Sequence, residues 1–308
     1  MKTIIIATVL FVVSGVFAQS REVGPYTLHP IAPGVIRVED ANHTNPPGLH
    51  YDENGEINGF NNCSDMYLVV GGERALLIDL SNFITWHDDA VGSLQTLVKE
   101  EIGARELVIA ITHVHGDHTG MLPAFRDDEN VTFWIQTEEF AGKDLFPVER
   151  TTPISSHPSL DLGGGVIVDT LELPGHTSHS TVYFLRGENL LFSGDAIGSG
   201  GGVWIFSAEG FARYRKSVDQ LIEFIQNPAH GIAAEDLQIY GGHYWQKGEK
   251  DLLTMQYILD MKSLIGEIKA GSAKEESVSF SPYLDTNFSY GEATITWNKA
   301  DSESFQNE

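Results

Sequence analysis

Four side chains that commonly bind metals fall within six consecutive residues, in the stretch His113-Val114-His115-Gly116-Asp117-His118. Histidine titrates near neutrality, and like charges this close together repel one another. The stretch is therefore explained either by a cation that orders it or by a solvated, histidine-rich loop. The other candidate ligands in the chain decide between these two interpretations.

Three more candidate ligands each end a segment that is typical of a buried β-strand. His176 ends VIVDTLELPGH, Asp195 ends NLLFSGD, and His243 ends LQIYGGH. A glycine directly precedes each of them, and glycine permits a tight turn or a close approach of the backbone. In α/β proteins, ligands bind beyond the carboxyl ends of the strands. We therefore expect all seven side chains to meet at one edge of the fold.

The spacing of these ligands favours two neighbouring cations. Residues two apart in an extended chain project to the same side, so His113 and His115 face one ion. Gly116 then lets the chain turn toward a second ion. The predicted first site is His113, His115 and His176, and the predicted second site is Asp117, His118 and His243, with Asp195 bridging both. Imidazole and carboxylate ligands suit zinc, with iron or manganese as alternatives, so we predict two Zn²⁺ ions per chain.

A pair of divalent cations would make this site a hydrolytic centre. Such a pair lowers the pKa of a shared water toward 7 and stabilises negative charge on a substrate. We expect the resulting hydroxide to attack a carbonyl carbon, with Asp117 moving the proton in addition to binding metal. His179 is a second candidate catalytic residue, as a donor to the oxyanion, and the alternative is that it only packs. Other histidines, such as His157, are expected to have ordinary surface or core roles.

The elements that would position the ligands are strands interleaved with helices. Apolar periodicity predicts strands over 35–38, 66–70, 75–79, 107–112, 131–136, 166–173, 181–185, 189–192 and 237–240, and helices over 86–102, 211–225 and 251–270. Residues 41–62 are rich in Asn, Gly and Pro and are predicted to be a loop. We expect residues 19–308 to form one layered α/β domain, with the tail at 275–308 adding edge strands.

Residues 1–18 are predicted to be a secretion signal peptide, which makes the mature protein extracellular. Lys2 precedes an apolar run that ends near the small residue Ala18. A membrane anchor is the alternative, but spanning takes about 20 apolar residues and this run is shorter. Cys63 is the only cysteine, so no internal disulfide is expected. Asn-X-Ser/Thr sequons that would permit glycosylation on a eukaryotic route begin at Asn42, Asn62, Asn130 and Asn287.

The charge of the chain limits its partners. It has 43 acidic and 19 basic residues and a formal net charge of −24, which opposes binding to nucleic acid. No later segment is long and apolar enough to cross a bilayer, so no membrane partner is expected after signal cleavage. The predicted partner is a small acyl substrate. The sequence leaves the oligomeric state open.

With these motifs the chain resembles the metallo-β-lactamase superfamily of hydrolases. The His-x-His-x-Asp-His signature and the later His176, Asp195 and His243 occur in the family's order, over roughly residues 30–250. The resemblance implies an αββα sandwich with a dinuclear site at its open edge. It also implies that Asp79, in LLIDL, orients the site. The family usually has a glycine soon after this aspartate, whereas this chain has Leu80-Ser81-Asn82.

The ligand set bears on the substrate. True β-lactamases of the superfamily generally lack the bridging aspartate, so Asp195 makes the chain more similar to the glyoxalase II-like, lactonase and thioesterase branches. The missing Arg and Lys cluster disfavours glutathione conjugates, and a neutral ester, lactone, thioester or amide is the predicted substrate. Trp204 and Phe206 are either an apolar pocket wall or core residues. The alternatives are a β-lactamase-like activity and a non-catalytic metal-binding interaction protein on the same fold.

Overall fold

The first half of the chain builds an eight-stranded sheet. The computed structural model describes residues 19–40, 48–51, 57–61, 63–199, 202–247, 252–281 and 283–307. The sheet order is β1 (Arg21–Val23), β2 (Tyr26–Ala32), β3 (Val35–Glu39), β6 (Asp65–Val70), β7 (Arg74–Ile78), β8 (Glu106–Ala110), β9 (Val131–Ile135) and β10 (Thr151–Pro153). Strands β7 to β10 run parallel, so their carboxyl ends share one edge.

A second sheet of five strands faces the first. Its order is β11 (Ser159–Asp161), β12 (Ile167–Glu172), β13 (Thr181–Leu185), β14 (Leu190–Gly194) and β16 (Gln238–Gly241). Strands β11 to β14 pair antiparallel, whereas β14 and β16 pair parallel. The carboxyl ends of β14 and β16 therefore lie side by side.

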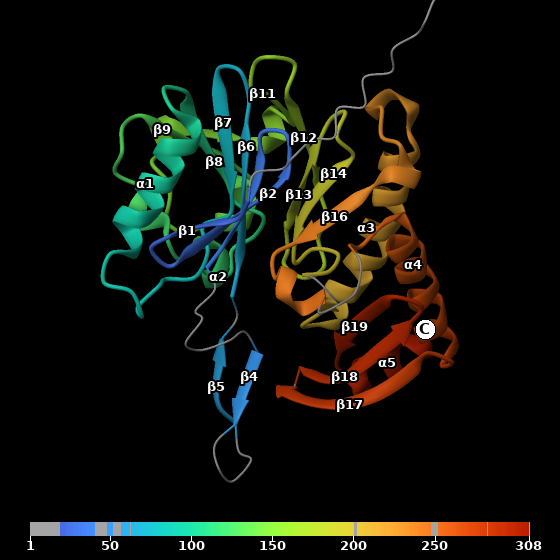
Figure 1. Cartoon of the computed structure of the whole chain (residues 1–308). Coiled ribbons are helices and arrows are strands. Elements are labelled where there is room, and N and C mark those ends of the chain that lie inside the picture. The colour runs from blue at the N-terminus through green and yellow to red at the C-terminus, as the bar shows by residue number, and fades with distance from the viewer. Residues whose placement is uncertain are drawn as a thin grey trace, which may run out of the picture.

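Helices cover the outer faces of both sheets (Figure 1). Helix α1 (Ala90–Ile102) packs on the first sheet, and α3 (Ala208–Gln226) and α4 (Met255–Ala270) pack on the second. Because side chains alternate along a strand, Leu76 and Ile78 point into the core between the sheets while Leu77 points toward α1. The order of layers is helix, sheet, sheet, helix. This confirms the predicted αββα sandwich.

The two sheets are joined by hydrogen bonds at the edge where the ligands were expected. The Tyr183 hydroxyl of β13 donates to the Ile111 carbonyl at 2.9 Å, and the Thr181 amide donates to the Thr112 carbonyl at 2.8 Å. Gly194 ends β14 with φ +49°, and a Cβ there would lie 2.4 Å from Thr112 Oγ1. The segment after β8 is thus held close to the ends of two strands of the other sheet.

Two helices begin four residues later than the sequence predicted. Helix α1 begins at Ala90, because the Asp89 side chain caps it by accepting from the Gly92 amide. Helix α4 begins at Met255, where the Thr254 hydroxyl accepts from the Gln256 amide. Ser, Thr and Asp favour the cap position, and an apolar pattern alone does not mark it. The apolar faces themselves lie where they were expected.

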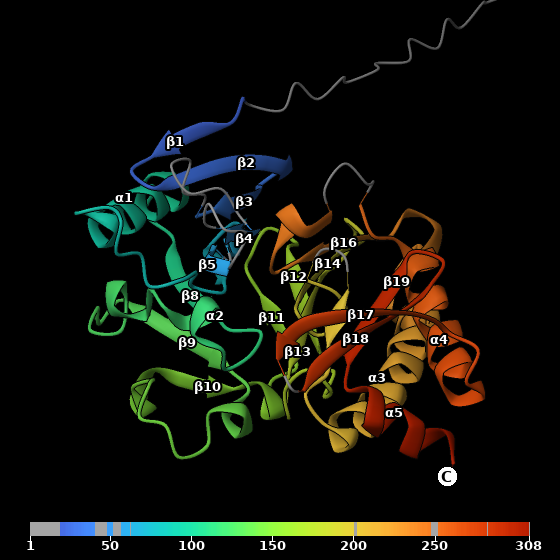
Figure 2. The same cartoon turned by 90° about the horizontal axis from the view of Figure 1, so that it is seen from below.

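The C-terminal strands form a sheet of their own instead of extending either main sheet. Strands β17 (Lys274–Ser281), β18 (Leu284–Tyr290) and β19 (Ala293–Trp297) pair in that order with β15 (Val203–Trp204). Figure 2 shows this sheet beside α3 and α4, with helix α5 (Lys299–Gln306) following it. The buried Trp297 ring stacks on Phe211 of α3, with centroids 4.0 Å apart. The apolar side of the tail is therefore used against helices.

The predicted loop at 41–62 also contains regular structure. Strands β4 (Gly48–Tyr51) and β5 (Ile57–Asn61) pair as an antiparallel hairpin. The predicted signal peptide, residues 1–18, lies outside the described residues. Among the described helices, none has the length and apolar character needed to cross a membrane.

Short helical turns connect the larger elements. Helix α2 (Gly116–Thr119) follows β8, and the 3-10 helices are η1 (Leu122–Ala124), η2 (Thr137–Phe140), η3 (Val148–Arg150), η4 (Ile154–Ser156), η5 (Pro228–His230), η6 (Ala234–Asp236) and η7 (Tyr244–Lys247). Of these turns, α2 and η2 lie beyond the ends of parallel strands β8 and β9. They therefore reach the edge of the sandwich at which the candidate ligands gather.

Candidate metal centre

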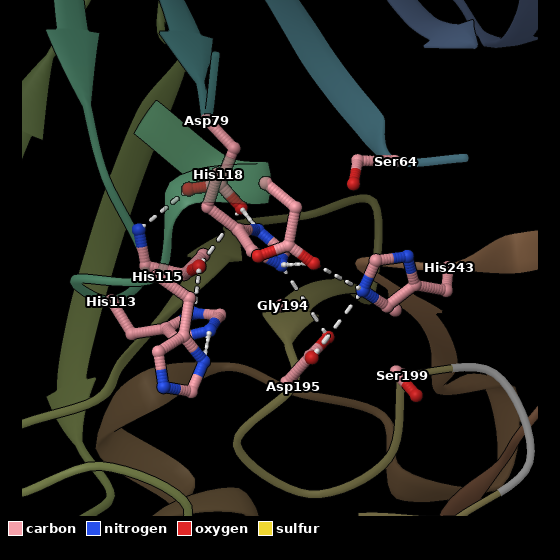
Figure 3. A network of polar contacts seen from close by, with 12 residues as sticks. Ser64, Asp79, His113, His115, His118, Gly194, Asp195, Ser199 and His243 are labelled. Carbon is pink, nitrogen blue, oxygen red and sulfur yellow. Dashed lines mark hydrogen bonds and ion pairs between the residues drawn. The ribbon is translucent and has the colours of Figure 1, made fainter. Parts of the chain in front are cut away.

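All seven predicted ligands lie together where strands of both sheets end (Figure 3). The first sheet supplies four of them and the second sheet supplies three. His113 and His115 follow β8, Asp117 and His118 belong to α2, His176 follows β12, Asp195 follows β14, and His243 follows β16. The cluster thus spans the contact between the two halves of the sandwich.

His113, His115 and His176 form one candidate cation site. Nδ1 of His115 lies 3.0 Å from Nε2 of His113 and 3.0 Å from Nε2 of His176. Each imidazole offers one nitrogen, and the three nitrogens lie within 4.8 Å of one another. Three neutral imidazoles at such spacing suit a single zinc ion with an open fourth position.

Asp117, His118 and His243 form a second candidate site. Oδ2 of Asp117 lies 3.3 Å from Nε2 of His243 and 3.9 Å from Nε2 of His118. The three ligand atoms of this group also lie within 4.8 Å of one another. Both groups suggested by the spacing in the sequence are thus present, and a third set, His113, His118 and Asp195, lies equally close and connects them.

Asp195 lies between the two groups. Its Oδ2 is 3.4 Å from Nε2 of His243 and 3.7 Å from Nε2 of His176, and its Oδ1 is 3.7 Å from Nε2 of His118. The two oxygens of this carboxylate thus face ligands of both groups. A cation held by either group would therefore lie close to this carboxylate.

Two buried atoms in the cluster have no hydrogen-bond partner among the described residues, and this supports metal binding. They are Nε2 of His118 and Oδ1 of Asp195. Leaving a buried polar group unpaired costs about 1–3 kcal/mol. The Gly242 backbone approaches both side chains closely, because a Cβ on Gly242 would lie 2.5 Å from His118 Cε1 and 2.7 Å from Asp195 Oδ1. A cation bound by both atoms would satisfy them, so the residues fit a metal centre.

Three of the imidazoles are oriented by hydrogen bonds from their outer nitrogen. Fixing the outer nitrogen of a ligating histidine sets the ring orientation and aims the inner nitrogen at the metal. The outer partners are a carboxylate and two backbone carbonyls. Nδ1 of His118 contacts Asp79 Oδ2, Nδ1 of His176 contacts the Trp204 carbonyl, and Nδ1 of His243 contacts the Cys63 carbonyl, each at 2.8 Å.

Asp79 takes the position that the family resemblance implied, despite the missing glycine after it. It adopts φ +63°, and its carboxylate accepts from both the amide and the hydroxyl of Thr112, at 2.7 and 2.8 Å. Ser81 also has a positive φ, +53°. Asp40 holds this loop by accepting from the Ser81 hydroxyl at 2.6 Å and from Asn82 Nδ2 at 2.9 Å. A buried carboxylate thus stabilises the turn that glycine usually allows.

The two groups differ in their electrostatics. Burial lowers the pKa of His113 well below its ordinary value and that of His176 to about 4. These rings are therefore neutral, as metal ligands must be. Burial acts the same way on His118, but the carboxylates of Asp79 and Asp195 outweigh it and raise its pKa to about 9. The carboxylates of Asp79 and Asp195 thus place negative charge around His118, and this charge would attract a cation.

His179 does not join the seven ligands. Its Nδ1 lies 2.7 Å from Glu172 Oε1, and its side chain is 37% exposed. The ring is not among the described residues that line the cavity over the cluster. Glu172 thus holds the ring at a partly exposed position, and the catalytic role of His179 stays a prediction. The backbone amide of His179 instead donates to Glu139 Oε2 at 2.8 Å.

A cavity of about 190 Å³ opens over the cluster. Besides ligands, its described lining consists of Ser199, Gly202, Trp204, Phe206 and Gln246. The Phe206 ring centroid is 5.9 Å from that of His115 and 5.4 Å from that of His176. Trp204 and Phe206 therefore form the apolar wall of the cavity.

Sequence reasoning missed the residues that hold the ligands through the backbone. Glu139 binds two amides beside ligands, and the Cys63 carbonyl binds both His243 and the Trp245 indole nitrogen. Contacts to the main chain require no particular side-chain pattern around them. No motif in the sequence could have singled out these two residues.

The chain belongs to the metallo-beta-lactamase superfamily, because the model of that family matches residues 64–243. This range contains every candidate ligand, and it confirms the family resemblance seen in the motifs.

Among curated proteins, the chain is similar to fungal lactamase-like proteins. It is 29% identical over 180 residues to the lactamase-like protein nscB of Arthroderma benhamiae, which covers 56% of this chain and 37% of nscB. It is 24% identical over 237 residues to the lactamase-like protein adaB of Aspergillus niger, covering 73% and 68% of the two chains. The chain thus spans only 37% to 57% of the length of the first nscB relatives.

Solved metallo-β-lactamases share the fold. The FIM-1 enzyme from Pseudomonas aeruginosa, crystallised in a mono-zinc form, matches with a TM-score of 0.52 and 17% identity, covering 79% of this chain and 96% of FIM-1. A metallo-β-lactamase from Pontibacter korlensis matches with a TM-score of 0.53 and 15% identity, covering 78% and 99%. At these identities the likeness shows a common architecture only.

Proposed function

We propose that this protein is a dinuclear-metal hydrolase that cleaves the acyl bond of a small neutral ester, lactone, thioester or amide. The observation that carries the proposal is the position of Asp195 between two groups of three ligands, with its buried Oδ1 unpaired among the described residues. Membership of a superfamily that consists generally of hydrolases supports it. The proposed cations are two zinc ions, with iron or manganese as alternatives.

The roles of the residues follow from their positions. Bound cations would supply an activated water and electrophilic stabilisation of the carbonyl oxygen. His113, His115 and His176 would hold one cation, and Asp117, His118 and His243 the other. Asp117 lines the cavity and is the proposed proton carrier in addition to a metal ligand. Asp79 fixes the His118 ring and so keeps Nε2 directed at the centre.

The cavity favours a small, uncharged substrate. Among its described lining residues, none is a lysine or an arginine that would attract an anion. Phe206 and Trp204 offer an apolar wall for the acyl substituent. On the polar side of the cavity, the Ser199 hydroxyl donates to Gln246 Oε1 at 2.5 Å.

The proposal predicts that His115→Ala removes metal and turnover together. The substitution takes one of three ligands from the first site, so we expect metal content to fall from two ions to one per chain. Turnover should fall by about 100-fold, an effect similar to removal of one strong electrostatic contact in a transition state. Metal analysis and kinetics on a panel of lactones, thioesters, esters and β-lactams measure both quantities.

His157→Ala is the matched control, because His157 is an exposed histidine outside the cavity lining. It should keep both ions and full turnover. Two bound ions without turnover on any substrate class would favour a non-catalytic metal-binding protein. Preferential turnover of the β-lactams would favour a β-lactamase, and a purified chain with no bound metal would contradict the proposed centre.

We also propose that the protein is secreted after cleavage of residues 1–18, which predicts a glycan on Asn130. Asn130 is exposed in the turn before β9. Asn287 instead lies within the C-terminal sheet, where its Oδ1 accepts from the Thr296 hydroxyl at 2.7 Å. Expressed with its own leader in a eukaryotic host, the protein should be secreted into the medium, and glycosidase treatment should lower its mass. Asn130→Gln should also lower the mass of the secreted protein, whereas Asn287→Gln should leave it unchanged. Asn42 and Asn62, the acceptor residues of the other two sequons, lie outside the described residues.

Retention of the chain inside the cells would contradict the proposed secretion. A secreted protein whose mass is unaffected both by glycosidase treatment and by Asn130→Gln would contradict the proposed glycan.

A further inference from the structure

We propose that Glu139 is a positioning residue that fixes the distance between His115 and His176 by binding both of their loops with one carboxylate. The inference rests on the proposed metal centre. It states that Glu139 strengthens the binding of a metal ion by His113, His115 and His176. It concerns a residue that no motif of the sequence indicated.

The carboxylate of Glu139 accepts one backbone amide from each of two loops. Its Oε1 accepts from Val114 at 3.0 Å, and its Oε2 accepts from His179 at 2.8 Å. Val114 stands between His113 and His115, and His179 is three residues after His176. All three imidazoles of the first group therefore belong to segments that Glu139 holds.

This contact bridges the two sheets. Val114 follows β8 of the first sheet, His179 precedes β13 of the second, and Glu139 lies on η2 beyond β9. The residue is only 9% exposed, so water competes little for its carboxylate oxygens. Hydrogen bonds to an ionised acceptor are shorter and stronger than neutral ones, which makes this contact an effective link.

The link is selective for the first group. The ring of His118 is set by Asp79, and the ring of His243 is set by the Cys63 carbonyl. Neither contact involves Glu139. A change at Glu139 should therefore move His113 and His115 relative to His176 while it leaves the second group in place.

Both oxygens must be acceptors for the link to work. Glu139→Gln keeps the size of the side chain but replaces one oxygen by an NH₂ group, which would face a backbone N–H donor. One of the two amides would then lose its partner, and the two loops would no longer be held by the same group. Glu139→Asp keeps both oxygens but is one methylene shorter, so it too is expected to reach only one loop.

The test measures Zn²⁺ affinity at each group separately, by competition with a chromophoric chelator. His243→Ala isolates the first group, and His176→Ala isolates the second. In the His243→Ala background we expect Glu139→Gln to weaken Zn²⁺ binding about 10- to 100-fold, the usual loss when a supporting contact to a metal ligand is removed. In the His176→Ala background the change should stay below about twofold. Glu138→Gln, an exposed neighbour, should change neither affinity.

Equal weakening in both backgrounds would overturn the inference, because Glu139 would then be a general structural residue. Unchanged affinity in the His243→Ala background would overturn it as well. If Glu139→Gln does not fold, the same comparison with Glu139→Asp decides. The measured quantity is Zn²⁺ affinity, which does not depend on hydrolysis. A protein that binds Zn²⁺ as expected but hydrolyses no substrate would contradict the proposed function and leave the inferred role of Glu139 intact.

Discussion

Asp195→Ala is expected to remove both cations and to lower turnover by on the order of 10³-fold, since a metal centre supplies several kcal/mol of charge stabilisation. The reason is geometric, because the carboxylate faces Nε2 atoms of both ligand groups at 3.4 to 3.7 Å. Without it, each group keeps three ligands but the two cations lose the anion that lies between them. Metal content per chain and kcat on the best substrate of the panel measure the effect.

Asp195→Asn separates the charge from the volume of this side chain. It keeps one carbonyl oxygen and should retain about one ion per chain, which places it between the wild type and Asp195→Ala. Asp127→Ala, at an exposed position, is the control and should behave as the wild type. Two tightly bound ions in Asp195→Ala would contradict the bridging role.

Gly242→Ala is expected to have the second largest effect. Its φ lies outside the left-handed region, so alanine is compatible with the backbone and the effect is purely steric. The added methyl would lie 2.5 Å from His118 Cε1 and 2.7 Å from Asp195 Oδ1, in the space between two ligands. We expect loss of the second-site cation, about 100-fold lower turnover, and a loss of about 1–3 kcal/mol in stability from overpacking. Metal analysis, kinetics and denaturant unfolding measure these three quantities.

Gly266→Ala is a suitable control for this substitution. Gly266 lies in α4, and a Cβ there meets nothing within 4 Å. Alanine should leave metal content and turnover unchanged and stabilise the helix by up to about 1 kcal/mol. A Gly242→Ala protein with normal metal content would contradict the expectation that a methyl group at this position displaces His118 and Asp195.

The sequence predicted much of the site because its ligands follow buried strands. His113, His176, Asp195 and His243 each come a few residues after an apolar run, and buried strands of an α/β fold end at a common edge. The apolar runs also predicted the central strands and hence the layers. Asp79 was found through the family resemblance, and the structure gives it a hydrogen bond to His118.

Contacts made by the backbone and by distant surfaces were not predictable in this way. The ring of His179 turns to Glu172, and this depends on a neighbouring strand rather than on the local motif. The alternation at Val278 and Phe280, and at Ile295 and Trp297, predicted strands in the tail but not their partners. In the structure β17 and β19 both pair with β18, and β19 also pairs with β15. Asp40 and Glu139 act by accepting amide or hydroxyl hydrogens far along the chain. Hydrogen bonds between residues far apart in the sequence cannot be predicted from the local pattern of residue types.

The position of the cluster across both sheets has a consequence for internal motion. Packed layers move most easily by small sliding displacements. Here such sliding would stretch or compress the distance between His115 and His176, because one follows β8 and the other follows β12. Any sliding of one sheet over the other would therefore change the ligand geometry. Cys63 is the only cysteine, so no internal disulfide can restrain this sliding. Non-covalent contacts between the sheets must restrain it instead. Substitutions that loosen the packing of the two sheets would therefore also disturb the ligand positions.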